Sequence, residues 1–176
     1  MGPEHIRNII PRVMDQIQQA EAKPLPILVD TREQEPWTFA GLPVVAVRAK
    51  LDQGDYGVPG VDFAVERKSP QDFIGSISFG RERFERELGR LQANGGGAIV
   101  IEGNLADLLD GSANRRPDGT QRVHTNAVLG SIGSFQCRFG VPAYFAGSRQ
   151  QAERLAYYLL RHAGRVAVEE AAEAPR

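Results

Sequence analysis

Short apolar runs alternate with amphipathic stretches of helical period along most of this chain, and this alternation restricts the folds open to it. The runs have the length of buried strands and lie at residues 27–29, 44–47, 63–65, 98–101 and 141–145. A helix opens at Ser69-Pro70, and further helices are expected over residues 81–93, 105–109, 125–139 and 150–162. Strands that alternate with helices in this way predict an α/β fold, with a mixed central sheet flanked by helices.

One domain accounts for most of the chain, and we assign residues 26–165 to it. Residues 1–25 are expected to form an amphipathic helix followed by a proline-rich linker, because Ile and Val recur there at three- and four-residue steps. Residues 166–176 are expected to be a frayed C-terminal tail. The sequence has no signal peptide and no apolar run of about 20 residues, so no membrane partner is expected.

The composition is typical of a globular protein from a reducing compartment. Apolar residues make up 41% of the chain. The single cysteine, Cys137, excludes an internal disulfide bond, which fits a cytoplasmic, intracellular location with the DNA of the cell. We expect Cys137 to be a small buried residue of a helix rather than a nucleophile.

Charge is unevenly distributed, although the net charge is only −1. Residues 1–110 carry 12 basic and 17 acidic side chains, whereas residues 111–165 carry eight arginines and only two acids. The basic part could hold a polyanion beside an acidic site. The sequence leaves open the alternative that these arginines are spread around the surface.

Acidic residues gather where the expected strands end. Asp30 follows the first strand, Asp55 lies between the second and third, Glu66 ends the third, and Asp72 lies in the first turn of the next helix. Ligands bind at strand ends in α/β sheets, and carboxylates brought together there repel one another unless a cation lies among them. Oxygen ligands suit Mg²⁺ or Mn²⁺, whereas the three scattered histidines lack zinc-ligand spacing.

Glu66 and Lys68 are two residues apart on one strand, so their side chains point to the same face. This spacing places a carboxylate for a metal beside an ammonium group for a water molecule or a phosphate oxygen. The chain has 18 Arg and only 3 Lys, and a desolvated lysine, unlike arginine, can shift its pKa and take part in proton transfer. Taken alone, however, residues 66–68 are more typical of a solvated strand end than of a catalytic site.

The surrounding motifs resemble those of the XPF-type structure-specific endonucleases. Residues 66–72 resemble the ERK-x-x-x-D signature of that family, and residues 30–33 resemble its D-x-R-E element. Gly54-Asp55 resembles its G-D motif, and residues 99–103 resemble its strand that ends in E-G. These motifs occur in the order found in the family, over residues 26–163.

The resemblance implies a restriction-endonuclease-like fold of the PD-(D/E)xK superfamily and metal-dependent hydrolysis of DNA, in branched or flapped substrates, with Mg²⁺ or Mn²⁺. The implied catalytic set is Asp30, Asp55, Glu66, Arg67, Lys68 and Asp72. The implied metal ligands are Asp55, Glu66 and Asp30. The implied supporting residues are Arg32, Glu33 and Arg81. Lys68 would position or activate water.

DNA contacts are expected from arginines, since the family's paired helix-hairpin-helix region is not found in this sequence. The candidates are Arg83, Arg115 and Arg116. Each candidate has an alternative interpretation without DNA: Arg83 could belong to a solvated helix face, and Arg115 and Arg116 to a mobile loop. Arg90 is expected on the solvated helix face. A homodimer or a partner subunit could supply further DNA binding. Trp37 and Phe39 are expected to pack in the core rather than to stack on bases.

Two other functions remain open at this stage. One is a non-catalytic scaffold subunit, although the inactive partners of this family typically lack signature acids that are all present here. The other is an RNase on the same fold. No pattern in the sequence indicates recognition of a ribose 2′-hydroxyl group, so the family resemblance alone favours DNA over RNA.

Overall fold

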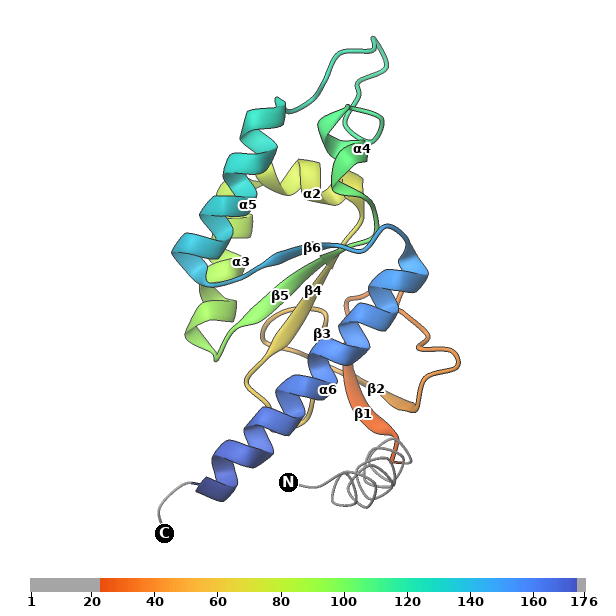
Figure 1. The fold of residues 1–176 in the computed structure, drawn as a ribbon, viewed down its shortest axis with the longest axis vertical. Helices are drawn as coiled ribbons and strands as arrows, with labels where there is room; N and C mark the ends of the chain where they lie inside the picture. The colour runs from red at the N-terminus through yellow and green to blue at the C-terminus, as the bar shows by residue number, and fades with distance from the viewer. Residues whose placement is uncertain (1–22, 174–176) are drawn as a thin grey trace, which may run out of the picture.

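The computed structural model of the chain describes residues 23–173, which form a six-stranded sheet flanked by helices (Figure 1). The strands are β1 (Leu25–Asp30), β2 (Val44–Ala49), β3 (Tyr56–Gly57), β4 (Ala64–Lys68), β5 (Gly97–Ile101) and β6 (Ala143–Phe145). The helices are α2 (Pro70–Ile77), α3 (Arg81–Ala93), α4 (Leu105–Leu109), α5 (Thr125–Phe139) and α6 (Arg149–Glu173). The helix expected within residues 1–25 lies outside the described residues.

The sheet is mixed, as the alternation of strands and helices predicts. Its strand order is β2-β1-β3-β4-β5-β6. β3 runs antiparallel to both of its neighbours, β1 and β4, whereas the other adjacent pairs are parallel. β3 has only two residues, which is too short to be recognised from a hydrophobic pattern.

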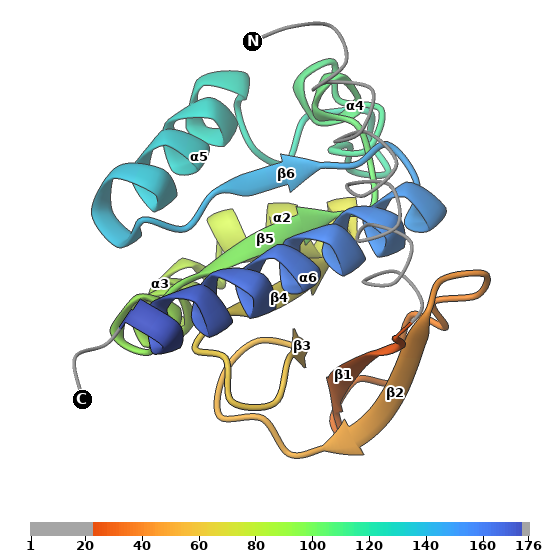
Figure 2. The same ribbon diagram turned by 60° about the horizontal axis from the view of Figure 1, so that its bottom comes forward.

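Two hydrophobic cores lie on opposite faces of the sheet. The first packs Phe73 of α2, Phe84 of α3 and Phe135 of α5 against Ile99 and Ile101 of β5. The second packs α6 against the other face, where Val100 and Trp37 are buried. Figure 2 shows α6 running along β4 and β5. Because β5 is covered on both faces, its position and that of the adjacent β4 are tightly fixed.

The C-terminal part of the chain differs from the expectation of a frayed tail. α6 continues to Glu173, so residues 166–173 are helical. No proline interrupts the helix before residue 175, and the single glycine, Gly164, is tolerated within it. No helix in the described part of the chain is long and apolar enough to cross a membrane.

Cys137 is exposed rather than buried, contrary to the expectation. α5 buries Val128, Ser131 and Phe135, which follow one another at three- and four-residue steps. Cys137 lies two residues beyond Phe135, and two residues turn an α-helix by about 200°, which places the thiol on the opposite, solvent-facing side. Trp37 and Phe39, in contrast, are buried packing residues as expected, each 2% exposed.

Candidate active site

A polar cavity of about 650 Å³ lies beside the end of β4 and one face of α3. It is lined from four directions: by the loop after β1, by the segment before β3, by β4 with the start of α2, and by α3. The charged residues that line it are Arg32, Asp52, Asp55, Glu66, Lys68, Asp72, Arg83, Glu87 and Arg90. The acids expected to form the site therefore meet in one place, with the exception of Asp30.

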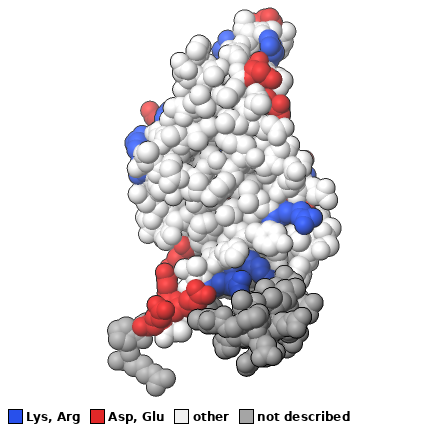
Figure 3. Space-filling model, in the orientation of Figure 1, with Lys and Arg blue, Asp and Glu red and all other residues white. Residues whose placement is uncertain are grey.

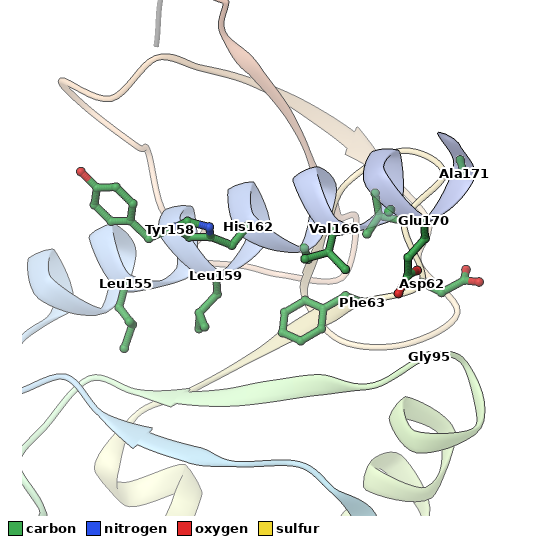
Figure 4. Close-up of a pocket in the computed structure, with 14 residues that line it drawn as sticks. Asp62, Phe63, Gly95, Leu155, Tyr158, Leu159, His162, Val166, Glu170 and Ala171 are labelled. Atoms are coloured by element: carbon green, nitrogen blue, oxygen red, sulfur yellow. The ribbon is translucent and has the colours of Figure 1, made fainter. Parts of the chain in front are cut away.

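A larger hollow, of about 880 Å³, lies elsewhere on the molecule and has a different character. It runs between α6 and the loop at residues 60–63, and Figure 4 shows Phe63, Leu155, Leu159 and Val166 along it. Figure 3 shows that the face over α5, β6 and α6 carries few charged side chains across its middle. The hollow lacks a convergent set of charged groups, so the polar cavity is the candidate for chemistry.

Asp55 is held at the polar cavity by backbone hydrogen bonds to two strands. Its N–H donates to the Val65 carbonyl oxygen at 2.9 Å, and its carbonyl oxygen accepts from the Asp30 N–H at 2.8 Å. Gly54 permits this close approach: its φ is +63°, and a Cβ there would lie 2.9 Å from Cβ of Ala64. The Gly-Asp pair thus places a carboxylate between the ends of β1 and β4.

β4 presents Glu66 and Lys68 to the same cavity, as the two-residue period of a strand predicts. Lys68 Nζ lies 2.7 Å from Glu66 Oε1, and the two side chains are only 13% and 12% exposed. Lys68 Nζ also lies 4.9 Å from the ring centre of Phe84 on α3. Residues 66–68 therefore form a shielded ion pair rather than a solvated strand end.

The Asp55 carboxylate is an unfavourable charge in this position. Its Oδ2 accepts one hydrogen bond, from the Arg67 peptide N–H at 2.8 Å. Burial, followed by repulsion from Glu66, raises the pKa of Asp55 to about 7. Two shielded acids beside a single lysine leave an excess negative charge, which a divalent cation would neutralise.

Lys68 is positively charged in the metal-free arrangement of the site. Burial alone would lower its pKa, but attraction to Glu66 and Asp55 outweighs burial, so the pKa of Lys68 is raised. Whether Lys68 exchanges a proton with water once a metal is bound stays a prediction. Lys68 is a cation fixed by its neighbours, and its N–H groups can donate to a water molecule or a phosphate oxygen.

The donors in the cavity fit a divalent cation that keeps part of its water shell. Within residues 23–173, no three His, Cys, Asp or Glu side chains form a ready metal-binding group. Mg²⁺ commonly takes only one or two carboxylates and completes its coordination with water and substrate phosphates, and Asp55 and Glu66 match that set. Gln53 also lines the cavity, and its buried Oε1 has no partner among the described residues, which leaves a further oxygen for water.

Asp30 does not line the cavity, and its expected role as a metal ligand is not supported by the geometry. Its carboxylate, 1% exposed, accepts hydrogen bonds from Arg32 N, Nε and Nη2 and from Leu51 N, at 2.7 to 2.9 Å. The side-chain hydrogen bond from Arg32 holds the pKa of Asp30 well below its usual range. Both oxygens are occupied, so Asp30 holds Arg32 at the cavity rim.

The Arg67 side chain lies on the opposite face of β4 from Glu66 and Lys68 and forms an ion-pair network with Glu33. Both residues also line a second hollow, of about 470 Å³, which they share with Asp55, Glu66, Lys68 and Asp72. The Arg67 guanidinium contacts Glu33 at 3.2 Å and Glu102 at 2.8 Å. Arg149, the first residue of α6, joins the network through Glu102 at 3.0 Å. Sequence reasoning did not identify Glu102 and Arg149 as site residues, although Glu102 stands in the segment that resembles the E-G strand end.

Three other charged residues line the cavity on its open side. Asp72 is exposed in the first turn of α2 and accepts a hydrogen bond from Ser69 Oγ at 2.7 Å. Arg83 and Arg90 both line the cavity from α3, seven residues apart and therefore on one helix face. Arg90 is exposed, as expected for a solvated face, and it also borders the cavity.

The remaining expected arginines lie away from the cavity. Arg81 donates to Glu85 at 2.9 Å and to Ser131 of α5 at 2.9 Å, so it joins two helices. Arg115 donates to the Gly119 carbonyl oxygen at 2.9 Å within the loop between α4 and α5, and neither it nor Arg116 lines the cavity. Two arginines of the basic part of the chain are paired with acids: Arg138 with Glu85 and Arg149 with Glu102.

The mixed six-stranded sheet flanked by helices is the α/β architecture expected from the sequence, and it carries an acid-x-lysine strand end with a second acid on the neighbouring turn. The chain belongs to the ERCC4 domain family, whose sequence model matches residues 29–159. Among curated proteins, none matches this chain in sequence.

Two solved structures share this fold. The chain resembles XPF from Aeropyrum pernix with a TM-score of 0.62 at 20% identity, over 82% of this chain and 69% of that one. A second structure, of the same protein in complex with DNA, has a TM-score of 0.62 at 21% identity, over 80% of this chain and 66% of that one. The sheet and its flanking helices are thus those of the XPF nuclease domain.

Proposed function

We propose that this chain is a metal-dependent endonuclease domain that hydrolyses phosphodiester bonds in DNA, in branched or flapped substrates that arise in repair, recombination or replication. The observation that carries the proposal is the convergence of Asp55, Glu66 and Lys68 in one polar cavity. Membership of the ERCC4 domain family supports it, as does the likeness to an XPF whose structure was solved with DNA.

In this proposal Asp55 and Glu66 hold Mg²⁺ or Mn²⁺. When bound, the metal stabilises charge on the scissile phosphate and lowers the pKa of a coordinated water molecule. Lys68, held by Glu66, donates a hydrogen bond to the attacking water or to a phosphate oxygen and so orients that group for the reaction. Asp72, at the open side of the cavity, accepts a hydrogen bond from that water.

DNA is the proposed partner, held at the cavity by arginines on its rim. Arg32 projects from the loop after β1, 68% exposed, while Arg83, 72% exposed, projects from α3. They flank the acids and would contact phosphates on either side of the scissile bond, with Arg115 and Arg116 as more distant contacts. A homodimer or a partner subunit would supply further DNA binding, and the domain would act inside the cell, where its substrate is.

Incubation with linear, flapped, forked and four-way DNA and with matched RNA substrates, each with Mg²⁺ or with EDTA, tests the proposal. We expect Mg²⁺-dependent cleavage of at least one branched substrate and none by the Glu66→Gln variant. Binding without cleavage in every case would favour a scaffold subunit. Cleavage confined to matched RNA substrates would favour an RNase.

A further inference from the structure

The sheet face turned away from the Glu66–Lys68 pair carries a nearly buried charge network that the proposed chemistry does not use. Arg67 is paired in register with Val100, which faces the α6 core, so its side chain lies on that face. Its guanidinium donates to both carboxylate oxygens of Glu102, at 2.8 and 3.0 Å, and to Glu33 at 3.2 Å. These three side chains are only 10% to 13% exposed.

Glu102 is the centre of this network. Its carboxylate also accepts from Trp37 Nε1 at 2.6 Å and from Arg149 Nη1 at 3.0 Å. Its backbone N–H donates to the Lys68 carbonyl oxygen at 2.9 Å. Although burial alone would raise the pKa of Glu102, the hydrogen bonds from Arg67 and Trp37 outweigh burial and lower it. Glu102 is therefore a charged group that fixes two consecutive residues at the end of β4.

Trp37 connects the network to Asp55 by a second route. Its indole ring stacks on the Tyr56 ring, with centroids 4.5 Å apart and planes at 21°. Its backbone N–H donates to the Tyr56 hydroxyl oxygen at 2.9 Å. Tyr56 directly follows Asp55, whose carboxylate accepts from the Arg67 peptide N–H. Asp55 is thus linked to Glu102 both through Arg67 and through Tyr56 with Trp37.

Arg149 fastens this arrangement to the start of α6. While Nη1 contacts Glu102, Nη2 donates to the carbonyl oxygens of Glu35 and Pro36, at 2.6 and 3.0 Å. These two residues immediately precede Trp37. The Arg149 guanidinium therefore holds both the Glu102 carboxylate and the backbone next to Trp37, whose indole N–H donates to that carboxylate.

We propose that Glu102 is a positioning residue for the acids Asp55 and Glu66, acting through Arg67 and Lys68, with Arg149 holding it in place. The inference rests on the proposed function, since it assigns these acids to a cation. Glu102 does not line the cavity, so its influence reaches the acids only through the strand end. Groups that orient metal ligands in this indirect way typically change metal affinity or activity by about 10–100-fold.

The test compares Glu102→Gln with Glu85→Gln as a matched control. Glu85 also bridges two arginines, Arg81 at 2.9 Å and Arg138 at 3.3 Å, but it lies on α3 and does not line the cavity. Ca²⁺ binding is measured by calorimetry and by the emission of Trp37, the single tryptophan of the chain. We expect Glu102→Gln to bind Ca²⁺ about 10–100-fold more weakly, with altered Trp37 emission. Glu85→Gln should match the wild type.

Equal Ca²⁺ affinity in the two variants would overturn the positioning role. Should Glu102→Gln fail to fold, Arg149→Ala provides the same test, because Arg149 is 43% exposed and leaves Glu102 in place. It should weaken Ca²⁺ binding in the same direction, and Arg149→Lys should restore part of the loss. A wild-type protein that neither binds Ca²⁺ nor cleaves DNA would instead contradict the proposed function.

Discussion

Lys68 Nζ lies 2.7 Å from Glu66 Oε1, two residues earlier on the same strand, and both side chains are largely shielded from water. The lysine balances one acid and leaves Asp55 without a counterion of its own. Because the pKa of Asp55 is raised to about 7, the site is prepared for an added positive charge.

Lys68→Arg should retain DNA binding but lose most cleavage. Lys68 Nζ is packed 4.9 Å from the Phe84 ring centre, and the larger, planar guanidinium cannot occupy that place while contacting Glu66 in the same way. Misplacing a group that orients the attacking water should slow single-turnover cleavage by about 10² or more. The dissociation constant for DNA, measured in Ca²⁺, should change little. Near-normal cleavage would reduce Lys68 to a source of positive charge.

Asp55→Asn should make the metal-free protein more stable at high pH while abolishing cleavage. The pKa of Asp55 is about 7 in the folded protein and near the ordinary 3.8 when unfolded, so the folded state keeps a proton that the unfolded chain releases. Metal-free stability therefore falls as the pH rises from about 4 to about 7. An uncharged amide avoids this loss.

The expected gain for Asp55→Asn is at least about 1 kcal/mol at pH 8 in EDTA, given about 1.4 kcal/mol per pKa unit. It should shrink below pH 4, where the wild-type carboxyl group is protonated in both states. Denaturant unfolding at the two pH values measures the difference. Lower stability of the variant at pH 8 would show that Asp55 is not a strained charge.

Asp30→Asn should weaken the fold without weakening metal binding. The Asp30 carboxylate accepts four hydrogen bonds from Arg32 and Leu51, so an amide in its place leaves a donor unpaired. We expect a loss of roughly 1–3 kcal/mol in the free energy of unfolding. Glu66→Gln should behave in the opposite way, with Ca²⁺ binding lost in calorimetry. Equal loss of Ca²⁺ binding in both variants would restore Asp30 as a ligand.

Arg83 and Arg90 should each contribute a phosphate contact. Replacing both with Ala should lower the slope of log affinity against log salt by about 0.9 for each phosphate neutralised. Arg154 and Arg165, exposed on α6, provide a control with the same change in charge. Arg115 and Arg116 are tested in parallel. If replacing an arginine pair gives the same slope of log affinity against log salt as the Arg154 and Arg165 control, that pair does not contact DNA.

Much of the fold could be predicted from the sequence because its signals are local. The helices over residues 81–93 and 125–139 follow from apolar residues at three- and four-residue steps, and the structure has them with these bounds. The shared cavity of Glu66 and Lys68 follows from the period of a strand. Asp55 could be predicted as a site residue because the Gly54-Asp55 pair occurs in order with the other motifs that resemble the family.

The remainder depends on register and on distant contacts that no local pattern contains. Glu102 meets Arg67 across 35 residues because β4 and β5 are paired in a particular register. Arg149 meets Glu102 across 47 residues because α6 begins beside the end of β5. The hydrogen bonds from Arg32 to Asp30 depend on a turn that the sequence alone does not define.

The proposed function requires that Asp55 and Glu66 hold the metal with which this domain would cleave DNA. Single-turnover cleavage of a flapped duplex by wild type, Asp55→Asn and Glu66→Gln, each with Mg²⁺ and with EDTA, tests it most directly. We predict cleavage by wild type with Mg²⁺ alone, and none by either variant, although all three proteins unfold cooperatively. Cleavage that persists in excess EDTA, or in a folded variant with Mg²⁺, would contradict the account.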